Sequence, residues 1–409
     1  MEERDHKKLG PELGLFYIDQ TVGKGLPMFL PKGAIVKREL ERFVIEEETK
    51  RGYLHVKTPD LARLELYVKS GHYPHYQDSM YTPIEIDDEK FMLRPMTCPH
   101  HFQLFLSRPH SYREAPMRIA ELAQLYRYEQ SGELMGLQRV RTFCLADAHI
   151  ICASEEQAAQ EVSDALDLIE YMAGVFGLTH GEDYRFRLSL GDRANSTKYY
   201  KNDAAWEKSE DLLRKVMQKR KEPFEEAKDE AAFYGPKIDV QMKNVNGKED
   251  TAFTVQYDFC MPDRFDLNFI GEDGNPHRAF VVHRSSIGAI ERIMAFLIEK
   301  YAGAFPLWLA PVQVAVLPVG EAHKEYAHKV LGELQAAGVR AEVLADDSLG
   351  KRIREAKTQK IPYTVVVGDK EVKDGTVTVE NNRNGDKQTV ALDDFIKPTV
   401  ERIRTRANV

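Results

Sequence analysis

The sequence of 409 residues contains few cysteines and no long apolar run. Its four cysteines, Cys98, Cys144, Cys152 and Cys260, form no CxxC pair, and their low density excludes a disulfide-stabilised scaffold. No apolar stretch approaches the roughly 20 residues that cross a bilayer, and the N-terminal residues are charged. We therefore expect a soluble, cytoplasmic protein without a secretory signal and without a membrane partner.

The chain also lacks an excess of basic residues, internal repeats and low-complexity tracts. Its formal net charge of -8 argues against a protein that coats nucleic acid with its whole surface, but it allows a local basic face. Such a face is predicted near the C-terminus, where Lys351, Arg352, Arg354, Lys357 and Lys360 lie on one helix. A run of this kind is equally typical of a solvated surface, so both interpretations stay open.

The length and the hydrophobic content of 43% predict a large core divided between two domains. Residues 33–59 are expected to form a long amphipathic helix that breaks at Gly52 and is followed by a strand. Further helices are predicted over residues 155–176, with Ser154 as the N-cap, and over residues 203–221. The segments with strand character are residues 138–152, 184–190, 236–243, 251–259 and 278–283. Because few helices separate them, they predict an antiparallel sheet with helices packed on it.

The order of the expected strands and helices changes after the Gly- and Pro-containing stretch at residues 303–311. From there, strands and helices alternate over about 100 residues, which indicates a smaller α/β domain. The predicted fold class is therefore α+β, with an antiparallel-sheet domain over residues 1–306 and an α/β domain over residues 307–409.

Two blocks in the first half of the chain stand out, and the second of them predicts a face that binds anions. The first, Arg51 to Pro59 (RGYLHVKTP), ends the long helix and enters an edge strand. The second begins with Tyr126-Arg127-Tyr128-Glu129 and resumes, after a polar loop, with Arg139 to Asp147. Two strands joined by this loop would carry Arg127 and Arg139 toward a common face, where a guanidinium fork suits phosphate oxygens.

A third block, His283 to Arg292, is a strand end that enters a helix through Gly288. The glycine lets the backbone approach a ligand closely, and Arg292 can reach over that ligand from one turn further on. Each block alone is weak evidence. The order and spacing of the three strongly resemble motifs 1, 2 and 3 of the class II aminoacyl-tRNA synthetases, over most of residues 30–300.

Within that class the sequence most resembles the threonyl-tRNA synthetase family, almost from end to end. The segments that carry the resemblance are Arg4-Asp5-His6, Ser70-Gly71-His72, Pro95-Met96-Thr97-Cys98-Pro99, Asp147-Ala148-His149, Phe233-Tyr234-Gly235-Pro236-Lys237 and Trp308-Leu309-Ala310-Pro311. The resemblance implies ATP-dependent ligation of threonine to threonine tRNA through a threonyl-adenylate. It also implies a homodimer formed through the long helix and the first block, and an anticodon-binding role for the second domain.

The resemblance implies a role for each matched residue of the ATP site. Arg127 would neutralise the α-phosphate, and Glu129 would read the adenine amino group. Phe143 and Arg292 would sandwich the adenine ring, while Arg139 would hold the outer phosphates with Mg²⁺ bridging them. Such catalysis consists mostly of positioning and charge stabilisation.

The same resemblance assigns threonine and tRNA contacts. Asp147 and Tyr234 would bind the hydroxyl and amine of threonine, together with Met96 and Gln256. Lys237 lies close to Tyr234 in the sequence and is expected to join Arg127 and Arg292 as a catalytic residue. The expected tRNA contacts are His72, near the acceptor end, and the basic residues Lys351, Arg352 and Arg354. A surface position without a role is an equally good interpretation of His72.

Cys98, His149 and His283 match the metal ligands of the family, which implies one Zn²⁺ per chain. Three protein ligands leave a coordination position open for substrate. An apolar pocket distinguishes threonine from valine only modestly, whereas an ion that accepts both the amine and the hydroxyl rejects valine. Serine carries the same donors and would pass this filter. His100 and His101 lie beside Cys98 in the sequence and are alternative ligands.

Six residues depart from the usual family pattern and cluster at the expected site. Leu145 and Thr251 stand where the family usually has Gln, Gln130 where it has Pro, Met135 where it has His, His100 where it has Gly, and Ala289 where it often has Ser. The loss of two amides predicts either weaker contacts to the adenylate or the terminal nucleotide, or a pocket reshaped for another ligand or for insensitivity to an inhibitor.

Family members commonly carry an N-terminal editing domain, and this sequence starts where the catalytic domain should start, as in a trimmed or naturally short form. We therefore expect it not to deacylate seryl-tRNA in cis. Two alternative functions stay open. One is a paralogue with impaired catalysis that binds tRNA or another partner, motivated by Leu145 and Thr251. The other is an enzyme that loads an amino acid onto a carrier protein, against which the second domain argues.

Overall fold

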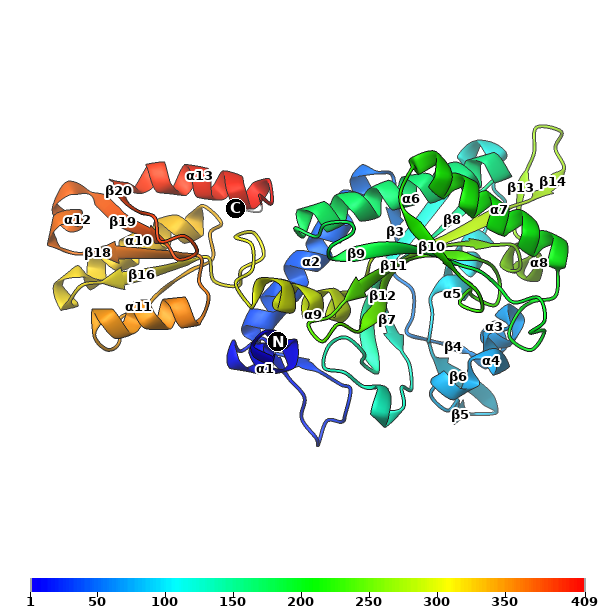
Figure 1. Cartoon of the computed structure of the whole chain (residues 1–409), viewed down its shortest axis with the longest axis horizontal. Helices are drawn as coiled ribbons and strands as arrows, with labels where there is room; N and C mark the ends of the chain where they lie inside the picture. Colours follow the sequence, from blue (N-terminus) through cyan, green and yellow to red (C-terminus); the bar gives the residue numbers. More distant parts are fainter. Residues whose placement is uncertain (1, 408–409) are drawn as a thin grey trace. The chain divides into compact units, whose positions relative to one another are not determined.

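The computed structural model describes residues 2–407, which form two compact units (Figure 1). The larger unit comprises residues 18–27 and 41–295, and the smaller unit comprises the described parts of residues 1–17, 28–40 and 296–409. This division by packing differs from the expected domains 1–306 and 307–409, because N-terminal residues pair with the C-terminal chain. His6 Nδ1 lies 2.6 Å from Glu299 Oε1, and Lys32 Nζ donates to Gln359 Oε1 at 2.8 Å.

An eight-stranded sheet forms the centre of the larger unit. Its strands, in spatial order, are β10 (Phe224–Ala227), β9 (Tyr184–Ser189), β11 (Lys237–Lys243), β12 (Glu249–Asp258), β15 (Phe280–Ala289), β8 (Thr142–Cys152), β7 (Met117–Tyr126) and β3 (Leu54–His55). The six inner strands pair antiparallel, and only the two edge strands, β10 and β3, pair parallel. The predicted antiparallel sheet is therefore confirmed.

Two helices cover one side of this sheet (Figure 1). Helix α6 (Glu155–Val175) contacts β8, β12 and β15, and helix α7 (Asp203–Arg220) packs against α6. The hydroxyl of Ser154 accepts a hydrogen bond from the backbone N–H of Gln157 at 3.2 Å, as expected of an N-cap. Both predicted helices are confirmed to within about two residues of their ends.

Shorter elements complete the larger unit. They are the helices α3 (Leu64–Ser70), α4 (His72–His75), α5 (Cys98–Phe105) and α8 (Met261–Phe265), the small sheet of β4 (Leu61–Arg63), β5 (Ile84–Ile86) and β6 (Glu89–Leu93), and the hairpin of β13 (Asn268–Ile270) and β14 (Pro276–Arg278). The long helix α2 (Pro31–Lys50) and helix α9 (Ile290–Tyr301) contribute residues to both units. Helix α5 matters most for function, because it begins at Cys98.

The smaller unit contains a five-stranded sheet with helices around it. Its strands, in spatial order, are β17 (Ala341–Val343), β16 (Val314–Pro318), β18 (Tyr363–Val367), β19 (Thr376–Asn381) and β20 (Lys387–Ala391). Its other elements are α1 (His6–Glu12), the short pair β1 (Phe16–Tyr17) and β2 (Met28–Phe29), and the helices α10 (Lys324–Ala336), α11 (Leu349–Thr358), α12 (Asp369–Asp374) and α13 (Leu392–Arg404). The α/β prediction is confirmed, and the antiparallel pair β19 and β20 adds to it.

Across residues 2–407, no helix combines the length and the apolar character needed to span a membrane.

Candidate functional site

A cavity of about 530 Å³ lies in the larger unit, over the eight-stranded sheet. Every residue expected to bind ATP, threonine or the metal lines it, as does His72. These residues are His72, Met96, Cys98, Arg127, Glu129, Arg139, Phe143, Asp147, His149, Tyr234, Lys237, Gln256, His283 and Arg292. Segments separated by more than 200 residues in sequence therefore meet at one site.

The register of the sheet explains how these distant residues meet. Lys237 pairs with Gln256, Gln256 with His283, and His283 with His149, on four successive strands. Directly opposed residues of antiparallel strands point to the same face, so the four side chains form a row across the sheet. A second row two residues along contains Asp239, Thr254, Ser285, Asp147 and Glu121.

Cys98, His149 and His283 form what we call the metal end of the cavity. Their candidate ligand atoms all lie within 4.8 Å of one another, and the two imidazole rings are 4.6 Å apart between centroids. All three residues are buried. Burial, with Asp147 and Asp258 nearby, raises the pKa of the Cys98 thiol well above its ordinary value, and burial lowers the pKa of His149. A divalent cation would favour the thiolate here, because metal binding releases the thiol proton.

In each of the two imidazoles at the metal end, one ring nitrogen lies within hydrogen-bond distance of another side chain. His283 Nε2 lies 2.7 Å from Asp258 Oδ2, which leaves Nδ1 for a metal. His149 Nδ1 lies 2.8 Å from His101 Nδ1, which leaves Nε2. Sequence reasoning considered His101 only as an alternative ligand, without predicting this supporting contact, and it missed Asp258. Asp258 follows Gln256 by two in the same strand, so strand alternation was an available signal for it.

The structure distinguishes the two other histidines considered near Cys98. His100 is not among the residues lining the cavity, and its ring lies 6.3 Å from that of Tyr67. Burial and the nearby Arg94 lower the pKa of His100 to about 4. His72 is buried in the cavity wall, with Nε2 at 3.8 Å from Cys98 Sγ and Nδ1 at 2.7 Å from Ser70 Oγ. His100 is therefore not placed as a ligand, and His72 is not a surface residue.

Arg127, Arg139 and Arg292 form the arginine end of the cavity. Arg127 Nε donates to the carbonyl of Pro95 at 3.1 Å, and its guanidinium lies 5.2 Å from the centre of the Phe143 ring. Arg292 donates to the carbonyls of Gln138, at 2.9 Å, and Thr251. These backbone acceptors orient both cations, and Arg292 Nη1 also lies 3.8 Å from Asp250 Oδ1.

Arg139 is held differently from the other two arginines. Its Nε donates to Glu129 Oε2 at 2.8 Å, and Glu133 lies on its other side at 3.3 Å from Nη2. Its side chain keeps 40% exposure. An incoming anion would therefore compete with carboxylates for Arg139, but not for Arg127.

The residues expected to bind threonine surround the metal end. The hydroxyl of Tyr234 donates to Gln256 Oε1, and its ring stacks on His283 with the centroids 4.9 Å apart. Burial raises the pKa of Tyr234, so the phenol remains a donor. Asp147 is also buried, which raises the pKa of its carboxyl, and its Oδ2 lies 4.0 Å from His149 Nε2.

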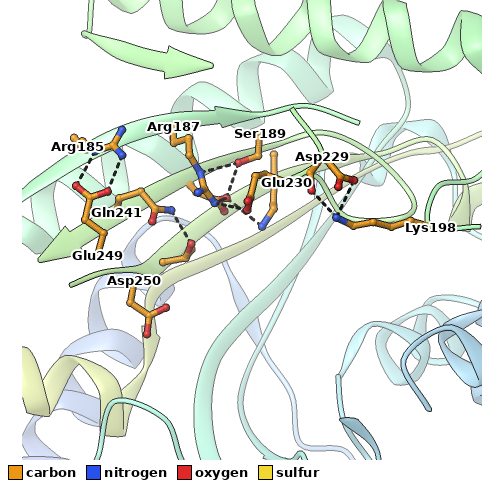
Figure 2. Close-up of polar contacts among 12 residues, drawn as sticks. Arg185, Arg187, Ser189, Lys198, Asp229, Glu230, Gln241, Glu249 and Asp250 are labelled. Atoms are coloured by element: carbon orange, nitrogen blue, oxygen red, sulfur yellow. Dashed lines mark hydrogen bonds and ion pairs between the residues drawn. The ribbon is translucent and has the colours of Figure 1, made fainter. Parts of the chain in front are cut away.

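Lys237 also lines the cavity and is held by the buried carboxylate of Asp239. Its Nζ lies 3.1 Å from Asp239 Oδ2, which also accepts from Arg187 Nη2 at 3.0 Å and Ser189 Oγ at 2.8 Å. Figure 2 shows Arg187 beside Ser189 and Glu230, and Arg187 Nη2 also donates to Glu230 Oε2 at 3.1 Å. A further ion pair, between Arg185 and Glu249, lies along the same sheet (Figure 2).

The residues that depart from the family pattern have identifiable contacts. Leu145 pairs with Ala289 across β8 and β15, and both pack against Phe143, which makes one cavity wall apolar. The hydroxyl of Thr251 accepts from Gln241 Nε2 at 2.6 Å, while its carbonyl accepts from Arg292. The support of Arg292 by Thr251 is therefore a backbone contact, independent of the side chain.

The basic residues of α11 lie in the smaller unit, and one of them differs from the expectation. Lys351 and Arg354 are exposed, and Lys351 Nζ lies 2.9 Å from Asp347 Oδ1. Arg352 is buried, and its Nη1 donates to the carbonyls of Pro318 and Leu344. Since these contacts occupy the guanidinium inside the fold, we correct the expectation that Arg352 contacts tRNA.

Comparisons with known proteins agree with this architecture. Residues 81–301 match the tRNA synthetase class II core domain (G, H, P, S and T), and residues 313–402 match the anticodon binding domain. The threonine–tRNA ligase of Geobacillus sp. strain WCH70 is 50% identical over 405 residues, which are 98% of this chain and 62% of that protein. The threonine–tRNA ligase of an Exiguobacterium species is 49% identical over 99% of this chain and 62% of its own length.

The chain thus spans about three fifths of the length of these curated relatives. A solved structure, described as the RNA binding domain of threonyl-tRNA synthetase from Cryptosporidium parvum Iowa II, has a TM-score of 0.91 and 32% identity to this chain. It covers 97% of this chain and 98% of its own. The chain therefore belongs to the class II tRNA synthetases and, among them, to the threonyl-tRNA synthetase family.

Proposed function

We propose that this protein activates threonine with ATP and transfers the threonyl group to threonine tRNA. The observation that carries the proposal is the single cavity that joins three arginines to a cluster of one cysteine and two histidines. The arginine end suits the phosphates of ATP, and the metal end suits an amino acid with two donor groups. The names of the relatives, threonine–tRNA ligases, agree with this pairing.

Activation requires that the threonine carboxylate attack the α-phosphorus of ATP while pyrophosphate leaves. Arg127 would stabilise the charge that develops on the α-phosphate, because its guanidinium is oriented by the Pro95 carbonyl and keeps its other donors free for the ligand. Arg139 would hold the outer phosphates after exchanging its contact with Glu129, and Glu129 would then be available to the adenine. Magnesium would enter with ATP, as in other phosphoryl-group chemistry.

The residues at the metal end fit one Zn²⁺ per chain. A thiol and two imidazoles are the donors zinc prefers, and three ligands leave a position open. When bound, zinc would act as a Lewis acid toward the amine and hydroxyl of threonine. Tyr234, fixed by Gln256 and stacked on His283, and the buried Asp147 would orient those two groups. Valine offers no hydroxyl to this site.

The tRNA would contact the smaller unit through the exposed Lys351 and Arg354, since cations there can pair with backbone phosphates. A homodimer would form through α2 and β3 of the larger unit. Ile45 on α2 and Leu54 on β3 are 41% and 58% exposed, which is the apolar surface such an interface would cover.

Amino-acid-dependent exchange between pyrophosphate and ATP, followed by charging of threonine tRNA, tests the proposal. We expect exchange with threonine, much less with valine, and charging of the tRNA. Threonine exchange without charging would favour the carrier-loading alternative. No exchange with threonine, serine or valine in folded, zinc-replete protein would contradict the proposal and favour a paralogue with impaired catalysis.

A further inference from the structure

Behind the metal end, a series of buried hydrogen bonds leads away from the cavity. His149 Nδ1 lies 2.8 Å from His101 Nδ1, and His101 Nε2 lies 3.3 Å from Glu121 Oε2. His101 and Glu121 are at most 1% exposed, and neither lines the cavity. His101 therefore reaches the cavity only through His149, which lines it, and Glu121 reaches it only through His101.

The far end of this series is fixed by several donors. Glu121 Oε2 accepts from Thr58 Oγ1 at 2.7 Å, and Glu121 Oε1 accepts from Thr58 N at 3.2 Å and Arg94 Nη2 at 3.1 Å. Arg94 is itself buried and also donates to the carbonyl of Gln124 at 2.7 Å. Surrounded by donors and paired with a guanidinium, the Glu121 carboxylate is ionised and acts only as an acceptor.

The donor and acceptor roles then follow in order along the series. Because Glu121 only accepts, His101 Nε2 carries the hydrogen, which leaves His101 Nδ1 to offer a lone pair. That lone pair accepts from His149 Nδ1, so the lone pair of His149 is on Nε2, the nitrogen left for a metal. His283 is set directly by Asp258 at its Nε2, so its lone pair is on Nδ1. The two ligating histidines thus present different nitrogens.

We propose that His101 and Glu121 are positioning residues that hold His149 in the tautomer and ring orientation required for metal binding. This inference rests on the proposed zinc site. The geometry has the form of the carboxylate–histidine–metal arrangements in which outer hydrogen bonds set ligand basicity, with one additional histidine inserted. The series begins at Thr58, on the segment that follows β3, so it ties the metal end to the edge of the sheet.

The test is the zinc affinity of the whole chain, measured by competition with a chromophoric chelator using zinc alone. We expect His101→Phe, which keeps a ring but removes both hydrogen bonds, to weaken zinc binding about 10- to 100-fold. Glu121→Gln, which keeps the size of the side chain, should weaken it less. In cobalt-loaded protein, both changes should shift the visible absorption bands, since the Nε2 of His149 would no longer be held.

His100→Phe is the matched control. His100 is adjacent to His101 on α5 and is also buried, but its ring nitrogens have no hydrogen-bond partner among the described residues. The control should change the zinc affinity by less than about twofold and leave the cobalt absorption bands in place.

The possible outcomes separate this inference from the proposed function. If the unaltered protein binds no zinc, both the zinc site and the positioning role are overturned. If it binds zinc, but folded His101→Phe and Glu121→Gln keep its affinity and cobalt spectrum, only the positioning role is overturned. If thermal unfolding shows that His101→Phe is not folded, the zinc affinity and cobalt spectrum of Glu121→Gln decide whether the positioning role is kept or overturned.

Discussion

At the arginine end of the cavity, backbone carbonyls and exposed, exchangeable ion pairs hold the cations. At the metal end, by contrast, every candidate ligand is buried and lies beside a further side chain. Arg139 keeps 40% of its side-chain surface exposed and is paired with Glu129, while Cys98 is 4% exposed. The two ends therefore differ in how far their side chains are already arranged before substrate binds. The metal end is organised before substrate arrives, and the arginine end completes its arrangement when an anion displaces a carboxylate.

The largest effect is expected from Cys98→Ala, which removes one of the three ligands of the metal end. We expect zinc to be lost and threonine-dependent pyrophosphate exchange to fall about 10³-fold, because a Lewis acid contributes several kcal/mol and each 1.36 kcal/mol is tenfold in rate. Zinc content and exchange rate are measured on the same sample. Cys152→Ala, which alters a cysteine outside the cavity lining, should retain both. Full exchange in zinc-free Cys98→Ala protein would contradict the proposed role of the metal.

At the opposite end, Arg127→Ala should separate chemistry from metal binding. We expect exchange to fall about 10²- to 10³-fold, the usual cost of removing a preorganised donor to the developing charge, with zinc content unchanged. Steady-state exchange and metal analysis check this. Loss of zinc in folded Arg127→Ala protein would show that the arginine end and the metal end depend on each other, which would contradict the distinction between them.

A smaller effect is expected in the pH dependence of stability through Glu121. Burial raises the pKa of Glu121, but hydrogen bonds from His101 and Thr58 outweigh burial and hold it at about 2, below the ordinary 4.5. The folded pKa is depressed, so the stabilisation is complete above pH 4.5 and is lost as the pH falls toward 2. Denaturant unfolding should therefore show that Glu121→Gln costs about 2 to 3 kcal/mol at pH 7 and much less near pH 3. An equal cost at both pH values would argue against this account.

Much of the site could be predicted from sequence because its residues lie in local blocks. Arg127, Arg139, Cys98, His149 and His283 each stand in a segment whose order and spacing indicated a role, and all five line the same cavity. The long helices α6 and α7 were also predictable, since their N-terminal signals and their periodicity are local properties.

The rest depends on contacts that no local pattern specifies. His101 and Glu121 meet only through the packing of α5 on the sheet, so Glu121 was not expected at the site and His101 was expected only as an alternative ligand. Arg352 looked like its exposed neighbours in a basic helix, but the turn of the helix points it into the fold, toward two carbonyls. The short strands β19 and β20 were missed. In the exposed edge strand β20 the polar residues resemble a loop, whereas the alternation of threonine and buried valine in β19 was an available strand signal.

The central claim is that the metal end selects threonine by its hydroxyl. The most direct measurement is the ratio of kcat/KM for threonine to that for valine in pyrophosphate exchange, before and after zinc is removed by a chelator and restored. An apolar pocket would give about 10². We predict a ratio well above this in zinc-loaded protein, loss of threonine exchange on removal, and recovery with zinc. A ratio of about 10² or less that is unaffected by the metal would contradict the account.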